Sequence, residues 1–377
     1  MNATPLTLRK KLGLELWRQR EKTVLRQHPL RQLFWECTLR CNLHCRHCGS
    51  DCKVTAGQQD MPKEDFLRVL DSIAAKTDPH QVFVILSGGE PLMRDDIEEC
   101  GAAIYQRGFP WGMVSNGFAL TAQRLQGLLR AGMHAITLSL DGLEAEHNWM
   151  RGHRQSFERA DQAIRLITDV ISKQRDKGWR PLSFDIVTCV NRRNYSQLAD
   201  IRDYLISRGV AYWRLFTVFP VGRAASDPDM QLTAEEFHGV FEFLRRTRQD
   251  GRIHADYGCE GFLGNYEGDV RDHLFSCQAG ITIGSVLVDG SISACTSIRS
   301  DYHQGNIYRD NFMDVWEQRY QPYRNHEWMR TDKCADCHYF RYCQGNGMHL
   351  RDSDGRLLLC HIHRLQESSC PSTPLFP

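Results

Sequence analysis

The sequence predicts an α/β fold in which parallel strands alternate with helices. From about residue 33 to residue 220, short runs rich in β-branched and aromatic residues recur, and amphipathic stretches with helical spacing separate them. Repeated β-α units of this size favour parallel strands joined by right-handed crossovers. An open sheet and a partial barrel are both compatible with the pattern. In either, the chemistry belongs at the carboxyl ends of the strands.

The predicted elements follow one another in a regular order. The strands cover residues 33–37, 82–86, 111–115, 135–139, 184–188 and 212–216. The helices between them cover residues 63–75, 97–106, 122–129, 157–171 and 196–206. In the first helix Phe66, Leu70 and Ile73 fall on one face, which is expected to cover the sheet.

The pattern changes after residues 220–224. One more helix is expected over 232–246, and the chain then becomes rich in glycine, aspartate and cysteine. Residues 283–295 predict a hairpin that turns at Asp289-Gly290, because Asp-Gly readily adopts the positive φ angles of such turns. The expected parts are a basic N-terminal helical extension (1–31), an α/β unit (32–225), a helical linker (226–250) and a cysteine-rich domain (251–377).

The N-terminal extension is basic. Residues 1–31 hold eight Lys and Arg against two Glu, and Leu12, Leu16 and Trp17 have helical spacing. A helix that docks on a membrane surface or a partner is one interpretation. The favoured one is a helix packed on the barrel with a solvated basic face.

Composition narrows the function classes. The chain has 377 residues, and its 47 Lys and Arg nearly balance 46 Asp and Glu, which argues against a general nucleic-acid binder. A hydrophobic fraction of 41% excludes a largely disordered chain. No run of eighteen apolar residues could span a membrane, and charges interrupt the start before a signal-peptide core develops. A cytoplasmic protein is expected.

Fifteen cysteines are unusual for such a protein. The number is odd, and a chain of this length builds its core without disulfides, so metal binding is the better explanation. The cysteines concentrate in residues 37–52 and 334–370, which predicts two metal regions. Expected bystanders, outside any metal site, are Cys37, Cys52, Cys100, Cys189 and Cys370.

The first metal region contains Cys41, Cys45 and Cys48, spaced C-x3-C-x2-C, directly after the first predicted strand. Three thiolates can hold a cubane iron–sulfur cluster and leave its fourth iron without a protein ligand. A zinc site completed by His44 or His47 is the alternative.

This loop and the segments after later strands resemble the radical S-adenosylmethionine (SAM) superfamily, whose fold is a partial (β/α)6 TIM-like barrel. The triplet occupies the position of the family's signature, although His47 replaces its usual aromatic residue. The sequence Gly88-Gly89-Glu90 follows the second strand, where the family contacts the methionine amino group. Glycines permit close backbone approach, and a carboxylate accepts from an ammonium.

Three more segments match the family in order. The resemblance implies that Ser115, Asn116, Ser139 and Asp141 contact the ribose and methionine of SAM, and that Arg151 pairs with the methionine carboxylate. Taken singly, each Ser or Asp could instead cap a helix, and Arg151 could be a surface cation.

The second metal region resembles the SPASM extension of radical SAM enzymes, which binds auxiliary iron–sulfur clusters. The resemblance assigns Cys334, Cys337, Cys343 and Cys360 to one fully ligated [4Fe-4S] cluster, although their spacing alone would also suit structural zinc. It assigns Cys259, Cys277 and Cys295 to a second cluster.

One expected thiolate is missing. Where the family continues with a further cysteine, this chain has Gly347. The second auxiliary cluster could therefore keep an open iron, take a ligand such as His349, or be smaller. Three cysteines with an open or exchangeable site are favoured.

The resemblance implies an oxidoreductase that reductively cleaves SAM to a 5′-deoxyadenosyl radical. This radical abstracts hydrogen from a peptide or protein, which is then oxidised or cross-linked, and flavodoxin or ferredoxin supplies low-potential electrons. Residues 258–267 and 343–349 are similar to a subgroup paired with small lipoproteins, which suggests a lipoprotein precursor as substrate.

Two questions about chemistry stay open at this point. Asp256 and Glu260 are candidate acid or base residues because they lie near Cys259. The alternative class is a non-catalytic, iron–sulfur or zinc-bearing scaffold that binds a partner. The complete set of Glu90, Ser139, Asp141 and Arg151 argues against that class.

Overall fold

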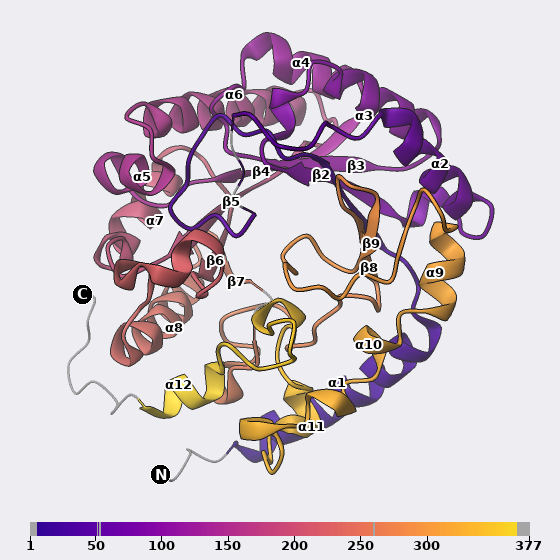
Figure 1. The fold of residues 1–377 in the computed structure, drawn as a ribbon. Coiled ribbons are helices and arrows are strands. Elements are labelled where there is room, and N and C mark those ends of the chain that lie inside the picture. Colours follow the sequence, from indigo (N-terminus) through magenta and orange to yellow (C-terminus); the bar gives the residue numbers. More distant parts are fainter. Residues whose placement is uncertain (1–5, 51, 53, 259–260, 368–377) are drawn as a thin grey trace.

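The computed structural model describes residues 6–50, 52, 54–258 and 261–367, which form a curved sheet with helices around its outer side (Figure 1). The sheet has ten strands in the order β10-β9-β8-β1-β2-β3-β4-β5-β6-β7. The strands are β1 Gln32–Thr38, β2 Phe83–Gly88, β3 Trp111–Ser115, β4 Met133–Ser139, β5 Ser183–Val190, β6 Tyr212–Thr217, β7 His254–Tyr257, β8 Ile283–Val286, β9 Ser291–Ser293 and β10 Gly305–Asn306.

The helices alternate with the central strands. They are α1 Leu8–Gln27, α2 Lys63–Ala74, α3 Ile97–Gln106, α4 Ala122–Arg130, α5 Glu144–Arg151, α6 Ser156–Asp176, α7 Leu198–Ser207, α8 Ala234–Asp250, α9 Phe312–Gln318, α10 Gln321–Arg324, α11 Phe340–Cys343 and α12 His361–Glu367. None of the described helices is both long and apolar enough to cross a membrane.

The six strands from β1 to β6 pair in parallel with their neighbours, as the sequence predicts. Their order follows the chain, so each crossover helix returns to the adjacent position. The carboxyl ends of these strands therefore meet at one rim. The α/β fold is confirmed as a parallel, partially closed barrel sheet.

The cysteine-rich part contributes strands to both edges of this sheet. β7 pairs in parallel with β6, and β8 pairs in parallel with β1. The hairpin predicted at Asp289-Gly290 is confirmed: β8 pairs with β9 in antiparallel fashion, and Gly290 has a φ of 84°. The sequence did not indicate that β7 and β8 would join the barrel sheet, because short edge strands carry little periodicity.

The core lies between the sheet and its outer helices. Trp35 of β1 stacks on Phe66 of α2 with ring centroids 4.3 Å apart, as expected from the apolar face of that helix. Trp111 of β3 lies against Gly101 of α3, where an added Cβ would come within 2.2 Å of the indole. These contacts fix the helices on the outside and leave the rim free for polar side chains.

Helix α1 packs on the cysteine-rich part of the chain. Leu14 is buried with Phe262, Phe275 and Tyr339. The Lys10 ammonium lies 2.6 Å from an Asp269 carboxylate oxygen. The favoured interpretation of a packed helix with a solvated basic face fits this arrangement, but the helix contacts residues after 260 rather than the barrel helices.

Candidate active site

The loop after β1 gathers sulfur atoms at the rim. Cys41, Cys45 and Cys52 are buried together, and Cys48 packs against them. The Cys52 thiol donates a hydrogen bond to Cys48 and thereby lowers the pKa of the Cys48 thiol. The structure thus brings the predicted triplet together. It also places Cys52, expected as a bystander, in contact with it.

Backbone hydrogen bonds hold this loop against two other rim segments. The Arg46 N–H donates to the Met150 carbonyl at 2.9 Å, at the end of α5. The Arg223 N–H, after β6, donates to the Cys48 carbonyl at 3.1 Å. Gly222 has a φ of 61°, and a Cβ there would lie 2.5 Å from the Cys48 carbonyl oxygen. The end of α5 and the segment after β6 therefore hold the cysteine loop in place from its two sides.

Glu90 is a buried carboxylate next to this loop. It accepts from the Ser115 hydroxyl at 2.8 Å, from the Asn116 N–H at 2.7 Å and from the Leu92 N–H at 3.1 Å. Burial raises the pKa of Glu90, although these hydrogen bonds act in the opposite direction. No ion pair joins Glu90 to a cation within the described part of the chain. A ligand ammonium would supply the missing positive charge.

The glycines before Glu90 allow two rim segments to touch. A Cβ at Gly88 would lie 2.1 Å from the Thr38 carbonyl oxygen, and one at Gly89 would lie 2.3 Å from the Arg40 carbonyl oxygen. The Glu90 N–H then donates to that Arg40 carbonyl at 2.9 Å. These contacts bring the glycine segment directly against the start of the cysteine loop.

Asp141 and Arg151 form a buried ion pair, 2.6 Å apart. Burial opposes the charge on Asp141, but Arg151 and several smaller contacts, among them the Cys189 N–H, together keep the pKa of this carboxyl below its usual value. Arg151 also donates to the Cys45 sulfur at 3.6 Å, and its Nε atom has no hydrogen-bond partner in the described part of the chain. That unused donor is suited to a ligand carboxylate.

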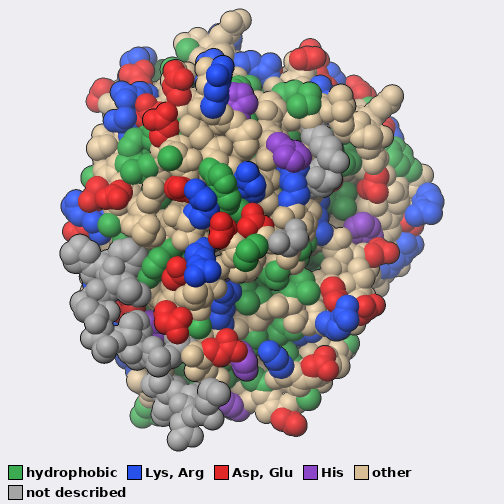
Figure 2. Space-filling model, turned by 60° about the vertical axis from the view of Figure 1, so that its left-hand side comes forward, with side chains coloured by type: hydrophobic (Ala, Val, Ile, Leu, Met, Phe, Trp, Pro, Cys, Tyr) green, Lys and Arg blue, Asp and Glu red, His purple; other side chains and the backbone are tan. Residues whose placement is uncertain are grey.

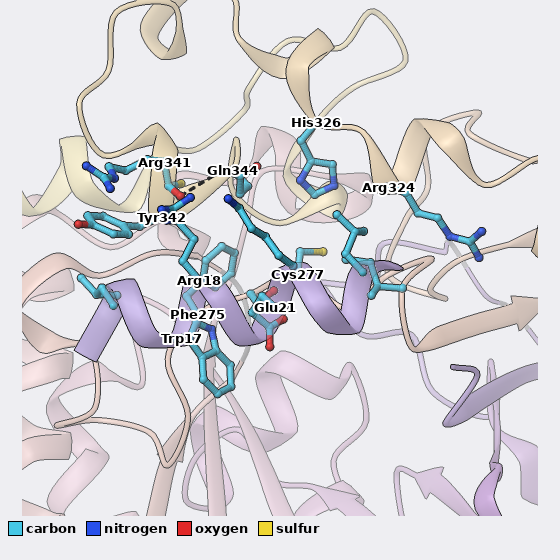
Figure 3. Close-up of a pocket in the computed structure, with 16 residues that line it drawn as sticks. Trp17, Arg18, Glu21, Phe275, Cys277, Arg324, His326, Arg341, Tyr342 and Gln344 are labelled. Carbon is cyan, nitrogen blue, oxygen red and sulfur yellow. Dashed lines mark hydrogen bonds between the residues drawn. The ribbon is translucent and has the colours of Figure 1, made fainter. Parts of the chain in front are cut away.

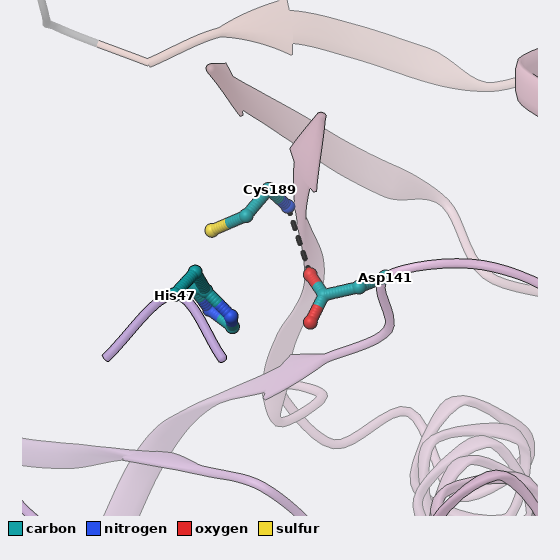
Figure 4. Close-up of side chains that lie close together, drawn as sticks. All are labelled: His47, Asp141 and Cys189. Atoms are coloured by element: carbon teal, nitrogen blue, oxygen red, sulfur yellow. Dashed lines mark hydrogen bonds between the residues drawn. The ribbon is translucent and has the colours of Figure 1, made fainter. Parts of the chain in front are cut away.

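His47 and Cys189 complete this corner of the site (Figure 4). Ligand atoms of His47, Asp141 and Cys189 lie within 4.8 Å of one another, and the Cys189 N–H donates to Asp141 at 2.9 Å. Cys189, expected in the core as a bystander, is half-buried beside the site. Burial lowers the pKa of His47, so its aromatic ring is uncharged at neutral pH. It can therefore fill the place of the family's usual aromatic residue.

A cavity of about 140 Å³ joins these groups. Its walls include all three cysteines of the triplet and most of the predicted SAM-contacting residues: Cys41, Cys45, Cys48, Gly88, Gly89, Glu90, Ser115, Asn116, Ser139 and Arg151. The Glu90 carboxylate, which has no ion-pair partner among the described residues, faces the same space as the Arg151 guanidinium with its unused Nε donor. This pair matches the ammonium and carboxylate of an amino acid, so the residues present fit the methionine end of SAM.

The structure also shows site residues that the sequence analysis missed. Arg223 lines the cavity, and its position after β6 could have indicated this by the rule that chemistry lies at strand ends. His147 accepts from the Asp141 N–H at 3.0 Å, and burial lowers its pKa to about 3, so this ring stays neutral. A lone histidine in a helix gives no sequence signal for such a role.

Four cysteines of the second region converge. Burial raises the pKa of the Cys343 thiol, and the neighbouring thiols of Cys360, Cys334 and Cys337 add to the rise. Arg351 is buried and donates to the Cys334 sulfur at 3.6 Å. Four neighbouring cysteines are the ligand set of a four-iron cluster.

Two more predicted ligands, Cys277 and Cys295, lie near Gly347. Burial raises the pKa of Cys277, the N–H of Met348 donates to its sulfur, and the Cys295 thiol is close enough to raise that pKa further. The loop around Gly347, where the family has a further cysteine, therefore lies beside Cys277 and Cys295. The ring of His349 packs edge-on against Phe219 at 5.0 Å. Cys259, the third predicted ligand, and Glu260 lie outside the described residues.

Asp256 is not among the residues that line the cavity. It lies on β7, with a carboxylate oxygen 3.4 Å from Arg248 of α8. Burial raises its pKa to about 6, from 3.8, despite the nearby arginine. Asp256 thus contacts Arg248 away from the residues that line this cavity, and its role as an acid or base stays a prediction.

The raised pKa of Asp256 predicts a pH-dependent stability. The folded state binds this proton more tightly than the unfolded state, so the stabilisation is complete below about pH 4 and is lost as pH rises through about 6. Between about pH 5 and pH 8 the loss is about 1.4 kcal/mol. Asp256→Asn removes this dependence, so the variant should gain in Tm over wild type as pH rises. Thermal unfolding at both pH values measures this, and an unchanged difference would contradict the assignment.

Two family models match the chain. The radical SAM superfamily matches residues 35–205, and the SPASM iron–sulfur cluster-binding domain matches residues 277–338. The first covers β1 to α7, with the cysteine triplet and Glu90. The second covers β8 to β10 and reaches Cys337.

Similar proteins span most of the chain. An AdoMet-dependent heme synthase from Nitratidesulfovibrio vulgaris is 26% identical over 82% of this chain and 85% of its own. The mycofactocin maturase MftC from Mycolicibacterium smegmatis is 28% identical over 84% of this chain and 77% of its own.

Solved structures share the fold. The structure of anSMEcpe with bound AdoMet superimposes with a TM-score of 0.67 at 19% identity, covering 90% of this chain and 95% of that one. Streptococcus suis SuiB bound to S-adenosylmethionine gives 0.64 at 16% identity, covering 95% and 79%. By the two family models, residues 35–205 belong to the radical SAM superfamily and residues 277–338 to the SPASM iron–sulfur cluster-binding domain.

Proposed function

We propose that this protein binds a [4Fe-4S] cluster through Cys41, Cys45 and Cys48 and uses SAM to modify a peptide or protein. A bound, reduced cluster would supply the electron for cleavage of SAM to methionine and a 5′-deoxyadenosyl radical, and this radical would abstract hydrogen from the substrate. The observation that carries the proposal is the buried carboxylate of Glu90, which has no ion-pair partner among the described residues and lines the same cavity as the three thiols. A scaffold without SAM would gain nothing from such a group.

The chain's own residues hold the two ends of the methionine part. Glu90, fixed by Ser115 and Asn116, receives the ammonium, and the free Nε donor of Arg151 receives the carboxylate. Asp141 holds the Arg151 guanidinium in place through their ion pair. Ser139 lines the cavity, where its hydroxyl can meet the ribose.

Glu90→Gln is expected to weaken SAM binding while the fold survives. The amide keeps the size of the side chain but leaves the ammonium without its counter-charge in a buried site. We expect the Kd for SAM to rise by about 30-fold or more, or about 2 kcal/mol. Anaerobic equilibrium dialysis measures it, with Glu99→Gln on the exposed side of α3 as control. Unchanged affinity in Glu90→Gln would contradict this role.

The auxiliary clusters are proposed from the converging thiols. Cys334, Cys337, Cys343 and Cys360 hold one complete [4Fe-4S] cluster, and Cys259, Cys277 and Cys295 hold a second with an exchangeable position beside Gly347. Anaerobic reconstitution should then give about twelve irons per chain. A value of about eight would show that the incompletely ligated cluster is absent.

The peptide class rests on similar proteins. MftC is named a maturase, and SuiB and anSMEcpe have been solved with peptides. The Fe-coproporphyrin III synthase of Methanosarcina barkeri is also similar, at 25% identity, so a tetrapyrrole must be tested alongside. A small lipoprotein precursor is the specific peptide proposed. Flavodoxin or ferredoxin would supply electrons in the reducing cytoplasm.

Isotope transfer separates these substrate classes. A precursor peptide from a neighbouring reading frame is produced with deuterated amino acids and incubated with reduced enzyme and SAM. Deuterium in the released 5′-deoxyadenosine, together with a mass change in the peptide, supports peptide modification. Deuterium transfer only from a deuterated iron coproporphyrin would refute it. SAM cleavage absent with every substrate would favour the non-catalytic scaffold.

A further inference from the structure

Helix α1 presents two different faces. On its inner face, Trp17, Arg18 and Glu21 line a cavity of about 210 Å³ between the helix and the cysteine-rich part of the chain (Figure 3). Leu14 points the same way and is 2% exposed. The inner face is therefore occupied by the chain's own contacts.

The outer face carries leucines in solvent. Leu8, Leu12 and Leu16 are 74%, 58% and 75% exposed. Their spacing of four residues puts them in one row along the helix, about 12 Å long. Single exposed apolar side chains need no explanation, but three in a row on one helix form a patch. We name these three residues the leucine row.

Cations flank the leucine row on both sides. Arg9 and Arg20 lie on one flank and Lys11 and Lys22 on the other, as the helical rotation of 100° per residue places them, and all four are exposed. The two acidic residues of α1 are neutralised by partners. Glu15 accepts from the Tyr342 hydroxyl at 2.7 Å and pairs with Arg18 at 2.9 Å, and Glu21 pairs with Arg20 at 2.9 Å. The exposed surface of the helix is therefore apolar along its centre, and Arg9, Lys11 and Lys22 keep its sides positive after Arg20 is paired with Glu21.

We propose that the leucine row and its flanking cations dock the protein on an anionic membrane surface. Leucines on one side with Lys and Arg beside them are the pattern of helices that lie in the bilayer interface. The long cationic side chains can reach the headgroups while the leucines enter the acyl boundary. The outer face of a single helix is convex, so it suits a planar surface.

A protein partner is the weaker fit. Binding energy in protein interfaces is concentrated on Trp, Tyr and Arg anchors, and leucine is under-represented among them. The leucine row contains no aromatic residue, because Trp17 lines the inner cavity. The basic flanks also favour acidic lipid headgroups over a neutral surface. This inference concerns where the protein binds and does not depend on which substrate it modifies.

Vesicle sedimentation tests the proposal with the reconstituted holoenzyme under anaerobic conditions. Wild type should sediment with vesicles of equal phosphatidylcholine and phosphatidylglycerol at low salt. It should bind phosphatidylcholine vesicles far less, and high salt should weaken binding. The variant Leu8→Ser/Leu12→Ser/Leu16→Ser should bind anionic vesicles at least about five-fold less. Its iron content should match wild type, because α1 keeps its inner contacts.

A matched control removes three other exposed apolar side chains. Val54, Tyr105 and Trp179 are 63%, 51% and 61% exposed and lie outside α1. Their triple replacement by serine should leave vesicle binding unchanged. Wild type that stays in the supernatant at low salt would overturn the proposal, as would equal binding by the leucine-row variant. A wild-type dimer that becomes monomeric in that variant would assign the face to a second copy instead.

Discussion

Cys45→Ala is expected to abolish SAM cleavage, a loss of roughly three orders of magnitude or more, while the auxiliary clusters remain. Cys45 is buried beside Arg151 and shares its cavity with Cys41 and Cys48. Two thiolates cannot hold the cluster with one open iron, so the cofactor that splits SAM is lost. The iron content should fall by about four per chain. Anaerobic assay of 5′-deoxyadenosine and iron analysis measure both effects.

A cysteine elsewhere in the fold provides the control. Cys100 is fully buried in α3, outside the cavity. Cys100→Ser keeps the size of the side chain and should retain both SAM cleavage and iron. Retained cleavage in Cys45→Ala would refute the ligand assignment. Loss of all iron in that variant would show that the two metal regions do not load independently.

Arg271→Met is expected to destabilise the cysteine-rich part by about 3–5 kcal/mol. The side chains of Arg271 and Glu267 are fully buried, with Nη2 and Oε1 3.0 Å apart. Glu267 also accepts from the N–H groups of Leu263 and Phe275, both at 2.8 Å. Removing Arg271 leaves a buried carboxylate without its counter-charge. Because these residues form the chain between Cys259 and Cys277, auxiliary iron should be lost as well.

The expected drop in Tm is of the order of 10 °C. Thermal unfolding of the anaerobic protein measures it. The double variant Glu267→Gln/Arg271→Met should recover much of the loss, because no unpaired charge is left inside. As a control, Arg245→Met breaks an exposed pair with Glu242 and should change Tm little. An Arg271→Met variant as stable as wild type would contradict this account of the buried pair.

The sequence predicts the central barrel well because two physical patterns are strong there. Buried parallel strands produce continuous apolar runs, and covering helices such as α2 keep their apolar residues on one face. The hairpin follows from Asp289-Gly290 alone. In contrast, β7 and β8 have four residues each, and their pairing with β6 and β1 depends on tertiary contacts that no local pattern encodes.

The candidate site is predictable where it consists of motifs at strand ends. The triplet, Glu90, Ser139 and Arg151 do line one cavity, because parallel strands bring their carboxyl ends to one rim. The positions of Cys52 and Cys189 beside the site could not be predicted, because nothing in a single cysteine's neighbours shows which way its side chain points. Asp256 was chosen by closeness in sequence to Cys259, and it instead pairs with Arg248 on α8.

The distribution of charged and apolar side chains over the surface is also only partly predictable from the sequence. On the face shown in Figure 2, acidic and basic side chains are intermixed, in line with a net charge of +1. The concentration of basic residues in α1 is therefore a local feature. Helical spacing alone grouped Leu12 and Leu16 with Trp17. The structure separates them, because α1 turns Trp17 toward the cysteine-rich part and the leucines toward solvent.

The most direct test of the central claim is SAM cleavage by the purified, reconstituted wild-type protein. After reduction with dithionite under anaerobic conditions, it should release 5′-deoxyadenosine and methionine from SAM in equal amounts. Release should depend on the reductant and should be lost in Cys45→Ala. Fully reconstituted protein that binds SAM but releases no 5′-deoxyadenosine, with or without candidate substrates, would contradict the account.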